Sequence, residues 1–385
     1  MFAIMIGMTS SLLVHAFFNW NMIALRESTI RNGLGHYQLS RAGFSGAGDD
    51  LSYRYLIEDA EPILGELRQI PEVELATARM GFSGLLAAGR RSTVVFGEAG
   101  DPDREMRLCS YAGLISGKPL RSDRADGIII GDGVAKKLSA RVGDTLTLVG
   151  YMSGGGINAV DLELAGITHS GVAELDLTRA AAPLEVVQSL LSIGDSVQKI
   201  VVLLKRTADT PKVLPRIEAI AKRYGLEYKH WEDLAEFYRS VKRMYEVVFT
   251  VIILIVMLIV MFTISNTVNM SLMERFREIG TIRALGTDCN QVAAIFIVES
   301  LLMGIAGGGL GLAASAAIAG LTELAGGIPV AIGGAEPGHV HIFFRLDPGV
   351  AFLCLLLFSL VAMASSVVPS RRAARISITE ALRWV

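Results

Sequence analysis

Leu272 to Gln291 reads LMERFREIGTIRALGTDCNQ and separates two long apolar runs of the chain. Its apolar side chains recur at three- and four-residue spacing, which predicts a short helix with one apolar side. Gly286 suits the left-handed residue that ends such a helix. The apolar side chains are those of Met273, Phe276, Ile279, Ile282 and Leu285.

The charged side chains of this segment exclude burial in hydrocarbon. We therefore expect a helix that lies at a membrane face, where the adjoining apolar runs or a partner protein hold its apolar side, because so short a helix is marginal in water by itself. A charged loop that only fixes membrane topology is the alternative interpretation. The charged residues are Glu274, Arg275, Arg277, Glu278, Arg283 and Asp288.

Four runs are long enough and apolar enough to cross about 30 Å of hydrocarbon. Val247 to Val268 has no charged residue, Val292 to Leu321 is broken only by Glu299, and Val350 to Val368 is uncharged. The first 25 residues form the fourth run. We expect an uncleaved span there, because no basic leader of a secretory signal precedes the apolar residues.

Basic residues in the short loops predict the orientation of these spans. The segment Leu272 to Gln291 and the C-terminal tail are rich in arginine, whereas Thr322 to Gly349 has only Arg345. Segment and tail are therefore expected in the cytoplasm, and the long region between the first two spans outside it. Arg26 and Arg31 follow the first span and oppose this orientation weakly. The arginines that favour it are Arg275, Arg277, Arg283, Arg371, Arg372, Arg375 and Arg383.

Composition indicates a protein that is partly in a membrane and partly in water. With 51% apolar residues and a mean hydropathy of +0.46 the chain is too apolar for an ordinary soluble protein, and 19% charged residues are too many for an all-membrane one. The net charge of −2 gives no reason to propose a nucleic-acid partner. Cys109, Cys289 and Cys354 are far apart, which suggests neither a disulfide framework nor a zinc site.

Strand and helix patterns alternate between the first two spans, which predicts an α+β domain. In Gly127 to Leu148 a buried strand, a helix from Gly133 to Leu138, a Gly143-Asp144 turn and a second strand follow one another. From Trp231 to Tyr245 a helical pattern continues into the second span without Pro or Gly. Other expected strands are 35–40, 73–79, 92–97, 160–167 and 199–205, and other expected helices are 50–68, 184–191 and 211–224.

Patterns that resemble ligand sites have structural explanations. Gly113 to Pro119 has one residue too few for a phosphate loop and a proline after Lys118. His339 and His341 lack a carboxylate or cysteine partner, and His36 has no second ligand nearby, so we expect no metal site. The glycines of the third span favour close helix packing; they are Gly304, Gly307, Gly308, Gly309 and Gly311.

Glu299 is the one ionisable residue well inside an expected span. Such a residue is costly in hydrocarbon and is a candidate for a proton relay or a substrate contact. The alternative is that it lies about two turns from the cytoplasmic end and pairs with Arg283 or with a partner subunit.

Arg277 to Thr287, REIGTIRALGT, resembles the cytoplasmic loop of the FtsX-like and MacB-like ABC transporter permeases, a group that includes the lipoprotein-releasing permeases LolC and LolE. GHYQLS at Gly35, GDTLTL at Gly143 and the tail PSRRAARISITEALRWV at Pro369 resemble further parts of these permeases. The family commonly has a glutamate at the place of Glu299, which favours its structural or coupling role. In the family the loop is a coupling helix that docks into a separate ATP-hydrolysing subunit. The resemblance implies ATPase contacts at Arg275, Arg277, Glu278, Ile279, Gly280, Arg283, Ala284, Leu285 and Gly286.

The resemblance also implies a fold: an integral membrane protein with four transmembrane helices and a large α+β, MacB-like extracytoplasmic domain between spans one and two. The expected parts are span one at 1–25, the outer domain at 26–240 with an inserted β-rich lobe at about 106–182, span two at 241–270, the coupling helix at 271–291, span three at 292–322, an outer loop at 323–348, span four at 349–369 and the tail at 370–385.

By this resemblance the chain is a permease subunit in a bacterial inner membrane and not itself an enzyme. It works with a cytoplasmic LolD-like ATPase dimer that binds ATP and magnesium, and with a second permease copy or paralogue, so that no cofactor is expected in this chain. Mechanotransmission would move a lipophilic cargo, a lipoprotein or lipid, from the outer leaflet toward a possible periplasmic carrier. The alternatives are an FtsX-like signalling subunit that activates a periplasmic hydrolase and a MacB-like efflux permease with an adaptor.

Overall fold

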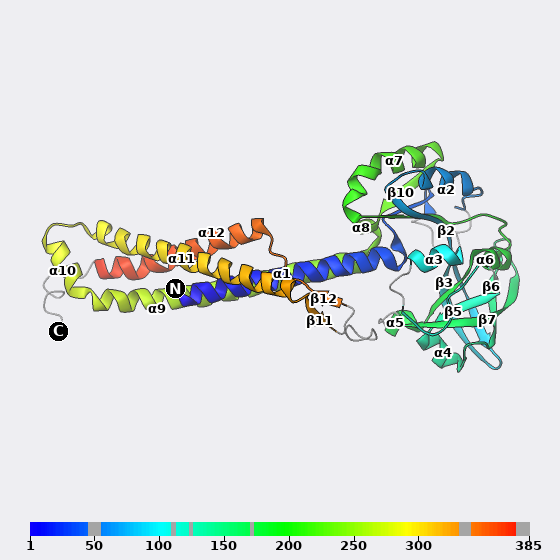
Figure 1. Cartoon of the computed structure of the whole chain (residues 1–385), viewed down its shortest axis with the longest axis horizontal. Helices are drawn as coiled ribbons and strands as arrows, with labels where there is room; N and C mark the ends of the chain where they lie inside the picture. Colours follow the sequence, from blue (N-terminus) through cyan, green and yellow to red (C-terminus); the bar gives the residue numbers. More distant parts are fainter. Residues whose placement is uncertain (45–54, 109–112, 123–125, 170–172, 331–339, 375–385) are drawn as a thin grey trace. The chain divides into compact units, whose positions relative to one another are not determined.

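The computed structural model describes residues 1–385 except 45–54, 109–112, 123–125, 170–172, 331–339 and 375–385. The described residues form two compact units (Figure 1). One unit is helical and comprises Met1–Ala24 and the described residues from Ser240 onward. The other unit mixes strands and helices and comprises the described residues of Leu25–Arg239.

Four long apolar helices build the helical unit: α1 (Phe2–Thr29), α9 (Glu236–Glu274), α11 (Cys289–Leu324) and α12 (Pro348–Ala374). The shortest has 27 residues, which at 1.5 Å per residue is about 40 Å and enough to span hydrocarbon. The helix α10 (Phe276–Ala284) lies between α9 and α11 along the chain. The antiparallel pair of β11 (Ile328–Val330) and β12 (Val340–Ile342) lies between α11 and α12. The expectation of four spans is confirmed.

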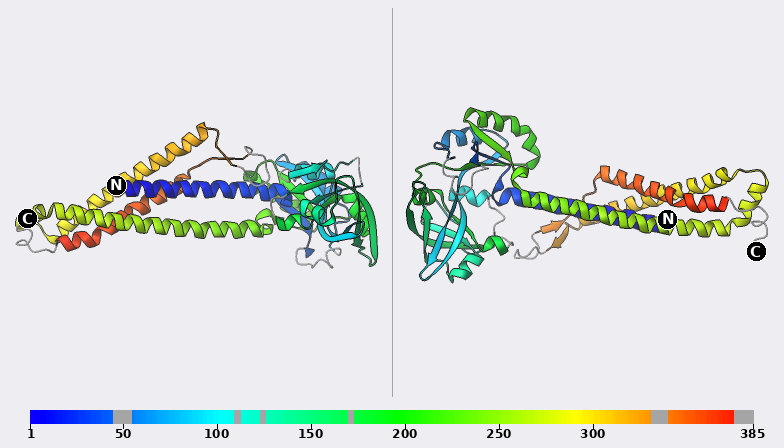
Figure 2. Two further views of the ribbon diagram at one scale, coloured as in Figure 1. Left: turned by 90° about the horizontal axis from the view of Figure 1, so that it is seen from below. Right: turned by 180° about the vertical axis from the view of Figure 1, so that it is seen from behind.

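Helices α1 and α9 lie side by side in both views of Figure 2. The rings of Phe18 and Tyr245 stack at a centroid distance of 4.8 Å, and the amide of Asn21 donates to the Tyr245 hydroxyl. Closer to the chain's start, Gly7 faces Val260, where an added Cβ would lie 3.0 Å from the valine methyl. These contacts place α1 against the second span along much of its length.

Glycines let α11 approach two neighbours at once. A Cβ on Gly304 would lie 2.9 Å from the Ser359 Cα of α12, and a Cβ on Gly311 would lie 2.7 Å from the Met8 Cβ of α1. Gly307 likewise faces α1 and Gly308 faces α12, whereas Gly309 has open space around it. The expected packing role is thus confirmed for four of the five glycines, because small residues let helices approach closely in a membrane.

In the α+β unit, ten strands of the described residues form one sheet with the order β10-β1-β9-β2-β3-β8-β5-β7-β4, and β6 pairs with β2 and β7. The strands are β1 (Tyr37–Arg41), β2 (Val73–Ala88), β3 (Arg91–Gly100), β4 (Gly113–Gly117), β5 (Gly127–Gly131), β6 (Thr145–Tyr151), β7 (Ile157–His169), β8 (Arg179–Pro183), β9 (Lys199–Leu204) and β10 (Leu226–His230). The helices are α2 (Glu61–Arg68), α3 (Pro102–Leu108), α4 (Asp132–Leu138), α5 (Ala173–Asp176), α6 (Leu184–Leu191), α7 (Thr210–Arg223) and α8 (Trp231–Leu234).

Two hydrophobic cores divide this sheet into lobes that share the long strand β2. In the first core, α2 and α7 pack over β1, β9 and the beginning of β2. In the second, α4 and α6 pack over the rest of β2 and over β3 and β5 to β8. This second cluster runs from Met80 to Leu191, so it begins earlier and ends later along the chain than the lobe expected at 106–182.

Local chemistry explains most elements. In β9, KIVVLL, five of six residues are buried, which fits a central strand covered on both faces. In α7, Val213, Ile217, Ile220 and Ala221 recur on one face and are buried. The succession β5, α4, turn and β6 agrees with the pattern of Gly127 to Leu148, and α6 has its expected bounds.

Three expectations about strands and helices need correction. The strands expected at 73–79 and 92–97 are parts of a longer hairpin, β2 and β3, because Gly81 and Gly84 lie within β2 and the chain turns only at Gly89. Helix α2 begins at Glu61, since Ile57 bridges to Val197 just before it; residues 50–54 of the expected helix lie outside the described residues.

The helical pattern from Trp231 to Tyr245 is interrupted at Ala235, where φ is −88° and ψ is 66°. The break brings the Trp231 ring edge-on to that of Tyr238 at a centroid distance of 5.0 Å. From Glu236 onward α9 continues without Pro or Gly to Glu274. Helix α12 contains Pro369 and runs on to Ala374; membrane helices tolerate an internal proline when neighbouring groups satisfy the freed carbonyl.

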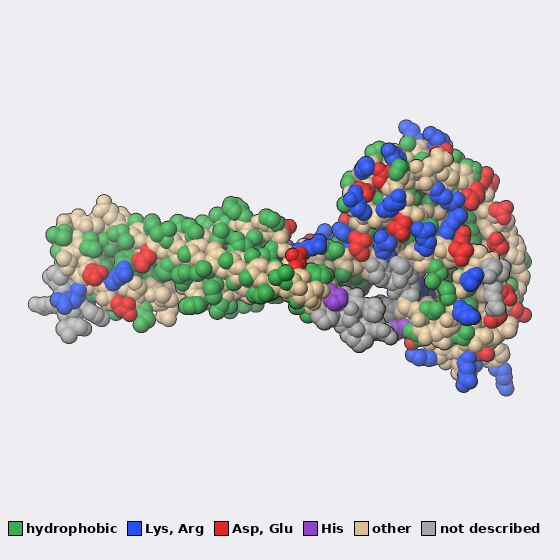
Figure 3. Space-filling model, in the orientation of Figure 1, with side chains coloured by type: hydrophobic (Ala, Val, Ile, Leu, Met, Phe, Trp, Pro, Cys, Tyr) green, Lys and Arg blue, Asp and Glu red, His purple; other side chains and the backbone are tan. Residues whose placement is uncertain are grey.

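Charge is distributed as a membrane protein requires. On the face drawn in Figure 3, hydrophobic side chains cover the helical unit, whereas Lys, Arg, Asp and Glu gather over the α+β unit. The charged side chains of the helical unit on this face gather near its two ends, one of which carries α10.

Candidate functional site

The segment between the second and third spans folds as a helix–turn–helix at one end of the helical unit. Helix α9 runs to Glu274, the backbone turns at Arg275 with φ −102° and ψ 17°, and α10 follows from Phe276. Phe276, Ile279 and Gly280 are buried, and Ile279 belongs to the same core cluster as Ala373 and Ala374 of α12. The helix α10 therefore packs against the ends of the membrane-spanning helices of the same chain.

The end of α10 is fixed by its own sequence. Gly286 has φ +100°, a conformation in which a Cβ would be strained. Its N–H donates to the carbonyl of Arg283, and the N–H of Thr287 donates to that of Ile282, so the helix ends in a Schellman motif. The role expected of Gly286 is thus observed.

The next helix starts immediately after this stop. The side chain of Asp288 accepts from the Cys289 N–H, and Asp288 and Gln291 together form a capping box. The residues Leu285 to Gln291 are therefore sufficient to stop one helix and start the next, which makes the exit from α10 rigid.

The apolar residues of the segment do not share one buried side. Phe276 and Ile279 are buried, but Met273, Ile282 and Leu285 are exposed, and Leu285 keeps 83% of its surface free within the chain. The chain itself therefore covers only the Phe276 and Ile279 part of the expected apolar side, because α10 is short and only its first turns reach the bundle. The result is an uncovered apolar edge beside the exposed Arg277, Glu278 and Ala284.

Glu299 lies one helix further on and is partly buried. Its carboxylate is 4.0 Å from the guanidinium of Arg275, so the structure pairs it with this arginine and not with Arg283. Both side chains are about half exposed within the chain, at 53% and 41%. The pair ties the turn before α10 to the beginning of α11.

The basic tail joins this end of the helical unit. Arg371 and Arg372 lie in the last turns of α12, next to the buried Ala373 and Ala374. Arg375, Arg383 and the rest of the tail lie outside the described residues.

In the α+β unit, His36 joins three elements. The Leu204 N–H donates to His36 Nδ1 at 3.0 Å, so Nε2 carries the proton and donates to the Thr207 hydroxyl at 3.0 Å. That hydroxyl in turn donates to Glu27 at 2.9 Å. Burial lowers the pKa of His36 to about 4, and the imidazole is neutral near pH 7. The structural role expected of His36 is observed.

Gly35, directly before His36, needs to be glycine. Its φ is +66°, and a Cβ there would lie 2.4 Å from the Val201 side chain and 2.9 Å from the Val202 carbonyl oxygen. The Gly-His pair of GHYQLS therefore lets β1 enter the sheet closely against β9.

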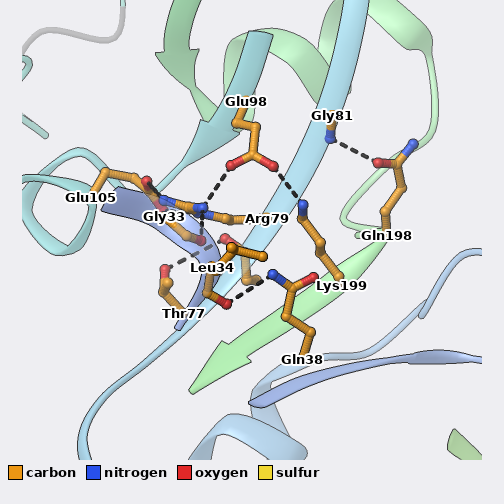
Figure 4. Close-up of polar contacts among 11 residues, drawn as sticks. Gly33, Leu34, Gln38, Thr77, Arg79, Gly81, Glu98, Glu105, Gln198 and Lys199 are labelled. Carbon is orange, nitrogen blue, oxygen red and sulfur yellow. Dashed lines mark hydrogen bonds and ion pairs between the residues drawn. The ribbon is translucent and has the colours of Figure 1, made fainter. Parts of the chain in front are cut away.

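A buried arginine, which sequence reasoning missed, organises the junction of the two lobes (Figure 4). Arg79 is 1% exposed and donates to the Gly33 carbonyl, to Glu98 and, through two nitrogens, to Glu105. Lys199 donates to the other oxygen of Glu98. A lone arginine in the strand pattern VELATARMGF was the available signal.

Charge pairing decides the protonation of this network. Burial opposes ionisation of Glu98, but the Lys199 and Arg79 charges outweigh it and lower the pKa of Glu98 to about 2. The network is therefore an ionised cluster at neutral pH, and it fixes the π-helical turn at Ile30–Leu34 to β2, β3 and α3.

The sequence patterns that resemble ligand sites, and the cysteines, lie as follows in the structure. Gly113–Gly117 is the edge strand β4, which pairs with β7, and the next described element along the chain is the strand β5. His341 lies in β12, and His339 lies outside the described residues. Cys289 and Cys354 are free thiols, and Cys109 also lies outside the described part.

Comparison with known proteins identifies two family regions. The family described as "FtsX-like permease C-terminal" matches residues 250–378, and that described as "MacB-like periplasmic core domain" matches residues 1–220, more than half of the chain. An uncharacterized ABC transporter permease of Methanocaldococcus jannaschii is 29% identical over 289 residues, 73% of this chain and 68% of the relative.

The lipoprotein-releasing system transmembrane protein LolE of Haemophilus influenzae is 23% identical over 337 residues, 82% of this chain and 79% of the relative. Among solved structures, the periplasmic region of MacB from Actinobacillus actinomycetemcomitans matches with a TM-score of 0.38 at 12% identity, covering 55% of this chain and 95% of that chain.

Proposed function

Because the chain belongs to the FtsX-like ABC transporter permeases with a MacB-like periplasmic core domain, we propose that α10 is its coupling helix and that a separate ATPase subunit binds the uncovered edge of this helix. The chain is a multi-pass membrane protein with an extracytoplasmic α+β domain, and it is the permease subunit of a MacB/FtsX-like transporter. ATP and magnesium bind to the partner ATPase.

One observation carries this proposal. The apolar side chains of Ile282 and Leu285 are uncovered at the end of a rigidly capped helix, next to the exposed charges of Arg277 and Glu278. A groove of a partner can cover such an edge, and the charges then fix its orientation. Because Ile279 packs in the same core cluster as residues of the four spans, a displacement of α10 can be transmitted to the spans.

A matched pair of leucine substitutions tests the proposal. Leu285→Asp places a charge on the proposed ATPase edge, and Leu324→Asp places one on an equally exposed leucine at the opposite end of α11. If the ATPase buries Leu285, loss of about 1.5–3 kcal/mol of apolar burial weakens the complex roughly 10- to 100-fold. Leu324→Asp leaves the affinity unchanged.

Co-expression with each ABC ATPase of the source organism that has no fused permease, followed by pull-down and ATPase assay in nanodiscs, supplies the measurement. Equal ATPase binding by both leucine variants would refute the docking edge. Undiminished binding by an Arg283→Ala/Glu278→Ala double variant would refute the role of the charges.

We propose a second permease copy or paralogue against α9, giving eight spans. Large apolar side chains of α9 are exposed in the single chain, including Val251, Leu254, Leu258 and Phe262. This surface contacts lipid or another permease. Cysteine crosslinking at Leu258 in native membranes tests the contact, with Leu302 of α11 as an equally exposed control.

The proposed cargo is lipophilic, a lipoprotein or lipid taken from the outer leaflet. Similarity to LolE, whose name describes lipoprotein release, supports this class over 82% of the chain. The unbroken helix from Glu236 to Glu274 supports transfer of motion to the outer domain. Two glycines inserted after Ser240 should abolish cargo release while ATP hydrolysis continues.

Co-purification from native membranes distinguishes the functions. Bound acyl lipid or lipoprotein supports extraction, whereas a cell-wall hydrolase indicates FtsX-like signalling and a periplasmic adaptor indicates efflux. Either of the last two results would replace the proposed cargo without changing the role of α10.

A further inference from the structure

Three potential metal ligands meet in the β-rich lobe, far from the membrane helices in sequence and outside the network of Arg79. Asp132 is the first residue of α4, His169 is the last residue of β7, and Asp176 is the last residue of α5. One ligand atom of each lies within 4.8 Å of the other two. Sequence patterns did not indicate this cluster, since the histidine lies 37 positions after the aspartate of GDG.

The histidine nitrogen points at both carboxylates. His169 Nδ1 is 3.0 Å from Asp176 Oδ2 and 3.6 Å from Asp132 Oδ1. This nitrogen is buried and has no hydrogen-bond partner of acceptable geometry within the described residues. In the tautomer with its proton on Nε2, the Nδ1 lone pair would face two carboxylate oxygens and be repelled, so a cation at this point favours the arrangement.

The surrounding backbone holds the three residues in place. A Cβ on Gly131 or Gly133 would lie 2.4 Å or 2.7 Å from the carbonyl oxygen of Asp176, so the two glycines beside Asp132 allow α5 to pack directly onto the start of α4. The position of Asp176 relative to Asp132 is therefore fixed by backbone contact and does not depend on flexible side chains.

The charges fit a divalent ion. Lys136 donates to Asp132 Oδ2 at 2.8 Å, which leaves the other carboxylate oxygen, Oδ1, directed toward His169. The Asp176 side chain is 2% exposed, whereas the His169 side chain keeps 35% of its surface exposed, so an ion can enter from solvent.

We propose that Asp132, His169 and Asp176 bind a divalent transition-metal ion, with Zn²⁺ as the best fit. Ligand atoms at about 2.0–2.2 Å from a tetrahedral zinc lie about 3.4 Å from one another, close to the 3.0 and 3.6 Å that separate the imidazole from the two carboxylates. One imidazole and two carboxylates suit Zn²⁺, whereas Mg²⁺ and Ca²⁺ prefer oxygen ligands alone.

Such an ion has a structural consequence. It joins the start of α4, the end of β7 and the end of α5, and so clamps α4 and α5 onto the sheet of the β-rich lobe. With three protein ligands, a fourth position remains for water or for a side chain of a docking protein.

Zinc titration of the untagged full chain in nanodiscs tests the site. The titration uses a His339→Asn/His341→Asn background, which removes the other closely spaced histidines. We expect one Zn²⁺ per chain, at least tenfold weaker binding by His169→Gln and by Asp132→Asn, unchanged binding by the control His230→Gln, and a rise in the melting temperature of the parent chain with Zn²⁺. Excess Mg²⁺ or Ca²⁺ should not displace the zinc.

Asp132→Asn and His169→Gln alter partly exposed side chains, so both variants are expected to fold, and circular dichroism verifies this. Substitution of Co²⁺ for Zn²⁺ gives a second readout, since visible absorption bands of a four- or five-coordinate ion should disappear in both variants. The site is refuted if the folded parent chain binds no Zn²⁺, or if both variants bind it as tightly as the parent.

Discussion

Acidification from pH 7.5 to pH 5 should loosen β9, whose Leu204 N–H donates to His36, and the size of the effect follows from the pKa of this imidazole. Burial lowers the pKa from 6.5 to about 4 in the folded protein. A base with a depressed folded-state pKa binds more protons when unfolded, so its contribution to stability is complete above about pH 6.5 and is lost as the pH falls toward 4.

A shift of the pKa from 6.5 to about 4 on folding lowers the free energy of unfolding by about 2 kcal/mol at pH 5 and by about 3 kcal/mol at pH 4, relative to neutral pH. A loss of about 2 kcal/mol corresponds to roughly 30-fold more frequent opening of the hydrogen bond from Leu204 N–H to His36 Nδ1.

Hydrogen exchange of the full chain in nanodiscs, followed by mass spectrometry of peptides that contain Lys199–Leu204, measures this opening. Rates are corrected for the intrinsic pH dependence of exchange. The comparison variant is His36→Asn, whose amide can still accept from the Leu204 N–H but does not titrate. The pH-dependent part of the opening should be present in the parent chain and absent in the variant; an equal pH dependence in both would refute the reasoning.

Three further predictions concern other parts of the chain. The pKa of Glu98 is lowered to about 2 in the folded protein, so its contribution to stability is present above about pH 4.5 and is lost as the pH falls toward 2. Lys199→Met should therefore destabilise the α+β unit at pH 7 and reduce the acid dependence of its unfolding in urea. An unchanged acid dependence would contradict this. Gly304→Leu should separate α11 from α12 and lower the melting temperature in detergent by the equivalent of about 1–3 kcal/mol, whereas Gly309→Leu, which has open space, should not; equal effects would count against the packing. Gly286→Val should strain the end of α10 at φ +100° and weaken ATPase binding, with Gly320→Val as the helical control, and the proposal fails if only the control variant is impaired.

Much of the helical unit could be predicted because its causes are local. Hydrocarbon offers no partner for backbone groups, so an apolar run of sufficient length must form a helix across the membrane. The end of α10 and the start of α11 likewise follow from Gly286, Asp288 and Gln291, whose hydrogen bonds reach only a few residues along the chain.

Other features depend on neighbouring elements, and the sequence did not decide them. Whether Ile282 and Leu285 are covered depends on how far the bundle reaches along α10, and periodicity in the sequence cannot show that distance. The partner of Glu299 is Arg275 and not Arg283, because the turn between α9 and α10 directs Arg275 toward α11. Helix α12 continues through Pro369 to Ala374, where Ala373 and Ala374 are buried in the bundle.

The sequence by itself determined the spans, the stop and start signals around the coupling segment, and the family resemblance, since each depends on residues close together in the chain. Only the tertiary structure placed Arg79 against Glu98 and Glu105, and Asp132 beside His169 and Asp176. Such groups attract one another over a few ångströms, and only the folded sheet brings together residues that the chain separates by tens of positions.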